Sequence, residues 1–269
     1  MNTELQSHIN STCCLSDPDA KALLTAANIT DEIATTEITK HVNRLKYYEI
    51  WDEMDAIYLF AGTSASQQKF NLKNPADTDA AFRLQFNGGW THSATGAKPN
   101  GTNAYANTFY NPATQGFSNT NAHIGIYVVS PATDQNGRLT GVSNATDDEP
   151  IYIIPRVWPP ADSAFGFGGN TGPTARFTQS DPRGFFQLNR NGLVTKGSKD
   201  GIVVATSTQT LASVTSLDFY LGCGRIQGYG NYRYSDKELG YVSLGNGLTD
   251  EKARIHNYLV NDLMTKLGR

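Results

Sequence analysis

The chain has 269 residues, of which 39% are hydrophobic and 17% are charged, a mixture too apolar for a disordered protein and too poor in charged helix formers for a coiled coil. The net charge of −3 and the pI near 5.9 exclude the basic surface of a nucleic-acid-binding protein. Lysine and arginine form no run that would attract an anionic membrane.

The first segment, residues 1–30, is polar and lacks the apolar core of a secretory signal. Since no stretch approaches the roughly 18 apolar residues of a membrane helix, we expect a cytoplasmically made protein without a membrane span. Asp17-Pro18-Asp19 indicates the start of a short helix, in which Leu23 and Leu24 give only a small apolar face. Because ordering costs roughly 1–2 kcal/mol per residue, we expect this segment to be ordered only against a partner, as an anchor would be.

Residues 31–55 are predicted to form an amphipathic helix. Thr30 is a candidate N-cap, with Asp31 and Glu32 in the first turn. A stripe at three- and four-residue spacing follows and consists of Ile33, Ile38, His41, Val42, Leu45 and Tyr48. Trp51 and Met54 extend this apolar face, which could meet its copies around a symmetry axis.

Residues 56–247 are rich in short runs of β-branched and aromatic residues, which predict strands. These runs are residues 57–60, 82–86, 124–129, 151–154, 185–188, 201–205, 217–221 and 239–244. Turn signals such as Asn87-Gly88 and Asn191-Gly192 lie between them. Because no helical pattern separates consecutive strands, we predict a mainly β fold built as a large antiparallel sandwich.

Residues 248–269 are predicted to form a closing helix. Thr249 is a candidate N-cap followed by two acids, and Gly268 is placed to end the helix. The residues that recur every four positions are Ile255, Leu259, Leu263 and Leu267. Such a stripe must be buried, so we expect this helix to pack on the sandwich or on a neighbouring subunit.

No metal or cofactor site is predicted. The five histidines are scattered singly, and the three cysteines (Cys13, Cys14 and Cys223) lack CxxC spacing, so free thiols are the simplest interpretation. Residues 134–137 could belong to a calcium loop, but a hairpin turn explains the same Asp-Gln-Asn-Gly sequence.

No catalytic residues are predicted either. Glycosidases with lectin-like sandwiches place several acids on one face of a strand, where the carboxylates can act together. The candidates here are residues 52–55, which contain Glu53 and Asp55, and residues 147–149, which contain Asp147 and Glu149. Neither set continues into a strand as the mechanism requires, and we interpret both as solvated acids.

The remaining signal is aromatic. Rings beside amides and arginine suit sugar binding, since pyranose C–H faces pack on rings while polar groups bind hydroxyls. The candidate glycan-binding residues are Trp90, Trp158, Arg225, Tyr229, Tyr232 and Tyr234. Ordinary packing of Tyr232 and Tyr234 on a strand is the alternative.

Several motifs carry a resemblance to a known family. They lie at residues 59–63, 69–75, 82–84, 88–93, 97–103, 181–186 and 244–251, after a helix ending at Ile50-Trp51 and before the C-terminal Leu267-Gly268-Arg269. From about Ile33 to its end, the chain resembles bacteriophage virion proteins with a concanavalin A/laminin-G-like sandwich. The resemblance implies a jelly-roll fold and a place in the virion as a head fibre, capsid decoration or tail adhesin, assembled in the host cytoplasm.

These expectations combine into one functional hypothesis. We expect a non-enzymatic virion surface protein that binds host-surface glycans, contacts other virion proteins through residues 1–30, and forms a homo-oligomer. Phage fibres favour a trimer. A glycan depolymerase on the same fold is the alternative, and a structural cement or joint protein is a further one.

Overall fold

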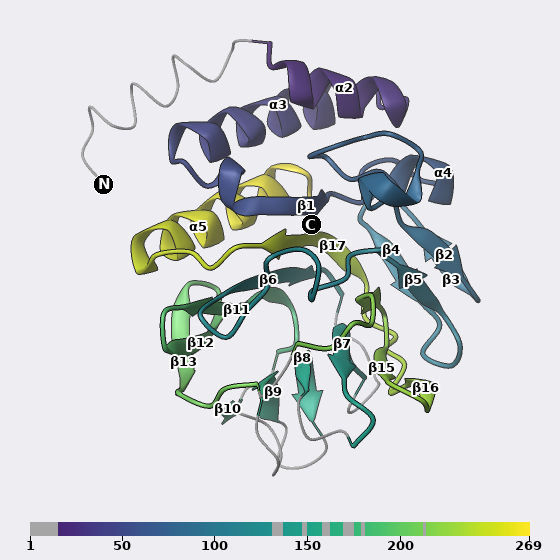
Figure 1. The fold of residues 1–269 in the computed structure, drawn as a ribbon. Helices are drawn as coiled ribbons and strands as arrows, with labels where there is room; N and C mark the ends of the chain where they lie inside the picture. Colours follow the sequence, from purple (N-terminus) through teal and green to yellow (C-terminus); the bar gives the residue numbers. More distant parts are fainter. Residues whose placement is uncertain are drawn as a thin grey trace.

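The structure, a computed structural model, describes residues 16–130, 137–146, 150–157, 162–168, 175–178, 181–211 and 214–269. Two β-sheets stack face to face, and a layer of helices covers the outer face of one of them (Figure 1). The predicted fold class, a mainly β antiparallel sandwich with N-terminal and C-terminal helices, is confirmed.

The first sheet has the strand order β13-β12-β11-β6-β17-β4-β3, and β1 also pairs with β17. All of these pairs are antiparallel. The strands are β1 (Met54–Tyr58), β3 (Trp90–His92), β4 (Ala97–Pro99), β6 (Asn121–Val128), β11 (Gly184–Asn191), β12 (Val194–Lys199), β13 (Ile202–Ser207) and β17 (Leu239–Gly245).

The second sheet has the order β10-β9-β8-β7-β14-β5-β2. A hairpin of β15 and β16 joins it through β15, which runs parallel to β7. The strands are β2 (Gln85–Asn87), β5 (Tyr105–Asn107), β7 (Thr140–Ser143), β8 (Ile151–Val157), β9 (Asp162–Phe167), β10 (Ala175–Thr178), β14 (Tyr220–Leu221), β15 (Gly224–Ile226) and β16 (Gly230–Tyr232).

The main core lies between the two sheets. Alternate side chains of each strand point inward, as the two-residue period of a strand requires. Ile124 and Ile126 of β6 are buried there with Phe186 of β11, and they meet Ile153 of β8 and Phe165 of β9. The other side chains of the second sheet point outward, so the outer face of this sheet need not be apolar like the core.

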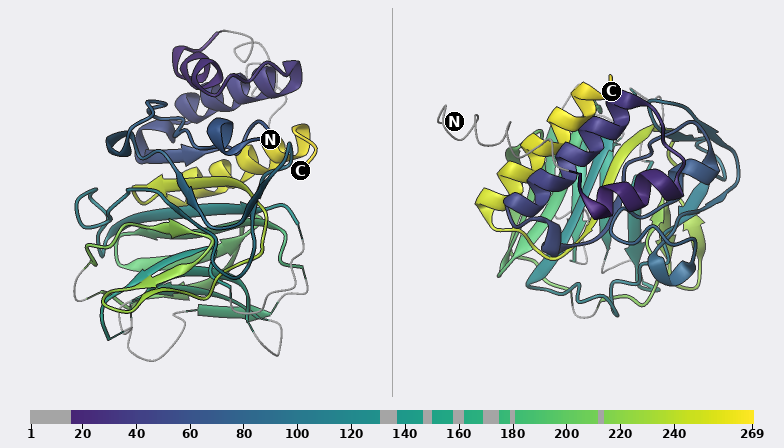
Figure 2. Two further views of the ribbon diagram at one scale, coloured as in Figure 1. Left: turned by 90° about the vertical axis from the view of Figure 1, so that its right-hand side faces the viewer. Right: turned by 90° about the horizontal axis from the view of Figure 1, so that it is seen from above.

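The helices form a second core on the outer face of the first sheet (Figure 2). They are α2 (Pro18–Ala26), α3 (Glu32–Tyr47) and α5 (Asp250–Lys266), with the short α4 (Ala65–Gln68) and the 3-10 turns η1 (Trp51–Glu53) and η2 (Asp79–Ala81) elsewhere. Helix α5 packs on the sheet and α3 packs on α5, while α2 lies on α3. None of the described helices combines the length and the apolar character needed to cross a bilayer.

The closing helix agrees with its prediction. Thr249 caps α5 by accepting a hydrogen bond from the backbone N–H of Lys252 at 3.2 Å, and Leu259 and Leu263 are buried against the chain's own sandwich. Gly268 follows with a positive φ of 73°, where glycine is favoured.

The N-terminal half departs from prediction at several points. Asp31 rather than Thr30 caps α3, accepting from the N–H of Ala34 at 2.8 Å. The helix predicted over residues 31–55 ends at Tyr47, because a 3-10 turn follows and β1 already begins at Met54. Phe82 was predicted in a strand, but it takes a positive φ of 58° as its ring packs on Tyr110, and the strand begins only at Gln85.

The expectation that residues 1–30 are ordered only against a partner is wrong for residues 17–29. Ala20 and Leu23 are buried against α3, and Lys46 of α3 forms ion pairs of 2.6 Å with both Asp17 and Asp19. Residues 1–15, including Cys13 and Cys14, lie outside the described residues.

The apolar face of α3 was expected to meet copies of itself, but Ile38, Val42 and Leu45 are buried within the chain's own helix-layer core. This face is therefore not available to a second copy.

Candidate ligand-binding surface

A tyrosine pair forms on the outer face of the second sheet, where β5 and β14 lie side by side. Register places Leu221 opposite Ala106, and both point into the core. Their neighbours Tyr220 and Tyr105 therefore point outward. Their rings stack with centroids 4.8 Å apart and planes inclined by 9°.

An arginine completes this stack. The chain reverses direction at Gly222, which has a positive φ of 83°, and then enters β15. This reversal brings the guanidinium carbon of Arg225 to 4.4 Å from the ring centroid of Tyr220, a cation–π contact. Burial raises the pKa of Tyr220, an effect that Arg225 opposes, so the phenol stays neutral at pH 7. Within the described ranges Arg225 has no carboxylate partner.

The β15–β16 hairpin adds two polar groups. Register pairs Arg225 with Asn231, so both side chains lie on the same face of the hairpin. Burial raises the pKa of Tyr234. A hydrogen bond from Asn231 opposes this effect, and the nearby Tyr105 adds to it. We call Tyr105, Tyr220, Arg225, Asn231 and Tyr234 the Tyr–Arg surface.

The structure brings together only part of the predicted site. Arg225 and Tyr234 belong to the Tyr–Arg surface. Tyr229 is 81% exposed at the tip of the β15–β16 hairpin. Trp158 lies outside the described residues.

Trp90 and Tyr232 make packing contacts outside the Tyr–Arg surface. The indole of Trp90 donates to the carbonyls of Asn87 and Tyr105 at 3.1 and 3.3 Å, which ties β3 of the first sheet to the second sheet. Tyr232 lies on the opposite face of the hairpin from Asn231, and its ring centroid is 4.5 Å from the guanidinium carbon of buried Arg138. For Tyr232, the alternative of sheet packing therefore describes the structure.

Tyr105 and Tyr220 lie outside the residues that sequence motifs single out for binding. A local signal exists, because each tyrosine lies between apolar residues in Ala104-Tyr105-Ala106 and Phe219-Tyr220-Leu221. This alternation is typical of a strand that buries one face and exposes tyrosine on the other. The stack itself joins residues far apart in the chain, and only the strand pairing reveals it.

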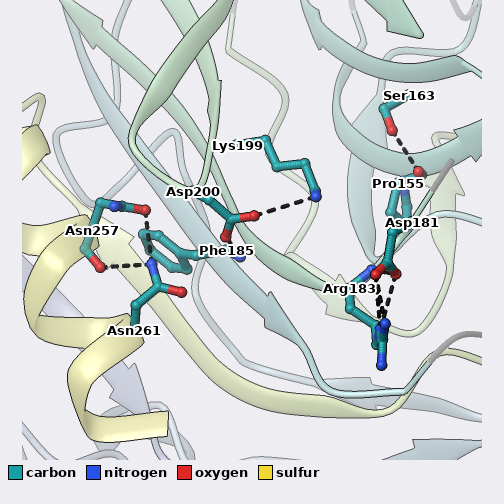
Figure 3. Close-up of polar contacts among 9 residues, drawn as sticks. All are labelled: Pro155, Ser163, Asp181, Arg183, Phe185, Lys199, Asp200, Asn257 and Asn261. Atoms are coloured by element: carbon teal, nitrogen blue, oxygen red, sulfur yellow. Dashed lines mark hydrogen bonds and ion pairs between the residues drawn. The ribbon is translucent and has the colours of Figure 1, made fainter. Parts of the chain in front are cut away.

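Acidic residues near the sandwich surface have their own partners. Figure 3 shows Asp181 paired with Arg183 at 2.7 Å, while Asp200 turns to Lys199 and to the backbone N–H of Phe185. Among the acids considered as catalytic candidates, Glu53 pairs with Lys252 at 2.9 Å and Asp55 accepts the hydroxyl of Tyr110 at 2.8 Å.

Asp147 and Glu149 lie outside the described residues, as do Asp134, Gln135 and Asn136 of the calcium-loop candidate. The described part of the chain contains no group of three or more ligand-type side chains that could hold a metal. Burial raises the pKa of the Cys223 thiol to about 12, so it is unreactive at neutral pH.

A polar hollow of about 190 Å³ lies on the other sheet, between β12, β13 and the start of α5. Its lining includes Lys196 and Asp250, which form an ion pair of 2.6 Å. Asn189 also lines it, but its amide already donates to the backbone C=O of Leu248 and accepts from its N–H. The hollow thus offers fewer free polar groups than its lining suggests.

Solved structures share this architecture at low sequence identity. Domain 4 of AbnA, a GH43 extracellular arabinanase from Geobacillus stearothermophilus in complex with arabinotriose, matches with a TM-score of 0.51 and 12% identity, over 76% of this chain and 98% of that one. The chain has a lectin-like β-sandwich fold. A mutant of Trypanosoma rangeli sialidase displaying trans-sialidase activity matches with a TM-score of 0.51 and 14% identity over 84% of this chain. The match spans 39% of the sialidase chain. No family model and no curated protein matches the sequence.

Proposed function

We propose that this lectin-like sandwich is a non-enzymatic glycan-binding protein and that the Tyr–Arg surface holds the sugar. The observation that carries the proposal is the stack of Tyr105, Tyr220 and Arg225, which is partly exposed and in which Arg225 forms no ion pair with a described carboxylate. Stacking fixes the guanidinium, so less side-chain entropy is lost when its N–H groups bind a ligand.

The chemistry of this surface fits a hydroxyl-rich ligand. The guanidinium donates hydrogen bonds, while the phenol hydroxyls and the amide of Asn231 both donate and accept them. The tyrosine rings offer apolar surface to sugar C–H groups. Because Arg225 forms no ion pair with a described carboxylate, its guanidinium can pair with a carboxylate on the ligand, so an acidic sugar is favoured over a neutral one.

We further propose that the protein acts on the surface of a bacteriophage particle, as a fibre, a decoration or a tail-associated adhesin. The resemblance of residues 59–103 and 244–251 to virion proteins supports this role. Display in many copies would turn weak binding at single sites into useful avidity. The N-terminal segment is the proposed contact with other virion proteins, and deleting residues 1–15 should then prevent incorporation into particles while the sandwich still folds.

A glycan array tests the binding proposal. The array should carry neutral oligosaccharides such as arabinotriose and acidic ones such as sialyllactose and trigalacturonate. We expect binding to acidic glycans that falls at least about tenfold in Arg225→Ala. Arg254→Ala is the matched control, because Arg254 is an exposed arginine on α5, which covers the other sheet. Binding that is unchanged in both Arg225→Ala and Tyr105→Ala would contradict the proposed site.

A further inference from the structure

Strand β13 is an end strand of the first sheet and lacks the usual protection of an edge. Natural end strands carry lysine, proline or inward charges that prevent pairing with another chain. Residues 201–211 contain no charged residue and no proline. Ile202 and Val203, at the start of β13, are 68% and 51% exposed.

A second pair of exposed apolar side chains lies at the opposite end of this strand. Register pairs Thr195 with Ser207 and Lys199 with Ile202, so the β11–β12 turn lies beside the end of β13. Leu193 in this turn is 70% exposed, and Val194, the first residue of β12, is 37% exposed. The edge of β13 is thus an uncharged ladder with an apolar pair near each end.

This arrangement is complementary to itself. If a second copy is related by a two-fold axis near Val204 and Ala205, its β13 runs antiparallel to the first. The Ile202–Val203 end of each copy then lies toward the Leu193–Val194 turn of the other. Because the strand carries no charge, no like charges meet at the axis.

The exposed area also fits a pair of copies. The four apolar side chains are between 37% and 70% exposed in each copy, so they leave apolar surface that a partner can bury, and a standard interface buries ~800 Å² on each partner. Pairing of the two β13 strands would bury further surface and add backbone hydrogen bonds. Strand β10, the end strand of the second sheet, lies beside β13, so both sheets end on this side of the sandwich.

We propose that the β13 edge is an interface with a second copy of this chain, which joins the two first sheets into one continuous antiparallel sheet. The pairing is closed at two copies, because each edge is used once. A dimer therefore replaces the trimer that fibre proteins suggest.

Sedimentation equilibrium of the full chain tests this proposal. We expect the mass of a dimer at micromolar concentration and at least about a tenfold rise in the dissociation constant for Ile202→Lys. Ile33→Lys is the matched control, because Ile33 is 60% exposed on α3, far from this edge, and should leave the mass unchanged. Circular dichroism at low concentration checks that both variants are folded.

A crosslink tests the geometry independently of any loss of stability. Ala205→Cys lies near the proposed axis and should give an intermolecular disulfide that the wild-type chain, with its own cysteines, does not form under the same mild oxidation. A monomeric wild type at 100 µM would overturn the proposal. A trimer would also overturn it. So would a dimer that remains intact in Ile202→Lys and that forms no disulfide in Ala205→Cys.

Discussion

Acid should destabilise this fold well above the pH at which carboxylates titrate. Three histidines are buried between the helix layer and the first sheet: His41 of α3, His123 of β6 and His256 of α5. Nε2 of His123 lies 2.8 Å from the hydroxyl of Ser243, and Nε2 of His256 lies 3.1 Å from that of Tyr241. The rings of His123 and His256 have centroids 5.2 Å apart.

All three imidazoles are neutral in the folded protein. Burial lowers the pKa of His41 to about 3, with Arg44 adding to the effect and Asp262 opposing it. Burial also lowers the pKa of His123 to about 3. The pKa of His256 lies well below 6.5 for the same reason, and His123 and His41 lower it further.

The sign and size of the effect follow from linkage. Well above pH 6.5 the histidines are neutral in both the folded and the unfolded state, and their contribution to stability is complete. As the pH falls from 6.5 toward 3, only the unfolded chain takes up protons, so stability is lost. At pH 5 the loss is about 2 kcal/mol for each of His41 and His123, roughly 4 kcal/mol together, and His256 adds a loss of the same sign, so the effect is a large part of the whole stability of many domains.

Urea denaturation between pH 7.5 and pH 5 measures this loss before most carboxylates titrate. We expect the unfolding free energy to fall as the pH is lowered, with a pH dependence that approaches the uptake of three protons on unfolding. In His123→Gln this uptake should fall by about one proton, whatever the variant does to stability at pH 7.5. A change of less than about 1 kcal/mol across this range would refute the argument, as would a variant that keeps the full slope.

Three further predictions concern packing and catalysis. Leu259→Asp places an unpaired charge between α5 and the sheet and should cost about 3 kcal/mol or more, so a melting temperature within a degree of wild type would show that α5 does not hold this position in solution. Trp90→Phe removes the one indole N–H that the carbonyls of Asn87 and Tyr105 share and should cost about 1–2 kcal/mol by denaturation while glycan affinity changes less than twofold; a large loss of affinity in a folded variant would support a binding role for Trp90. Polysaccharides incubated with the pure protein should give no new reducing ends, and turnover abolished by Asp147→Asn or Glu149→Gln would support the depolymerase alternative.

Local signals account for the parts of the fold that the sequence predicts well. The Asp17 and Thr249 caps lie within three residues of the amides they bind, so α2 and α5 can be located without tertiary information. The stripe on α3 was equally clear, but periodicity shows only that a face is buried. The structure shows that α5 covers this face. Because α5 lies some 200 residues later in the chain, the local sequence of α3 cannot distinguish it from a second copy.

The candidate site shows the same division. Arg225 and Tyr234 could be selected by their residue types in a glycine-rich segment. The side chains that organise them could not, because Tyr105 and Tyr220 meet only when β5 and β14 pair. Trp90 shows what residue type leaves out: its ring looks suited to sugar stacking, and the sequence does not reveal that carbonyls from the second sheet hold its indole N–H.

The most direct test of the glycan-binding surface is a titration of the isotope-labelled protein with the strongest acidic ligand from the array, followed by NMR. Saturable shifts should concentrate on the amides of Tyr105, Tyr220, Arg225, Asn231 and Tyr234, and Arg225→Ala should abolish them. Shifts confined to the hollow around Lys196 and Asp250, or no saturable shift at millimolar ligand, would contradict the assignment of this surface.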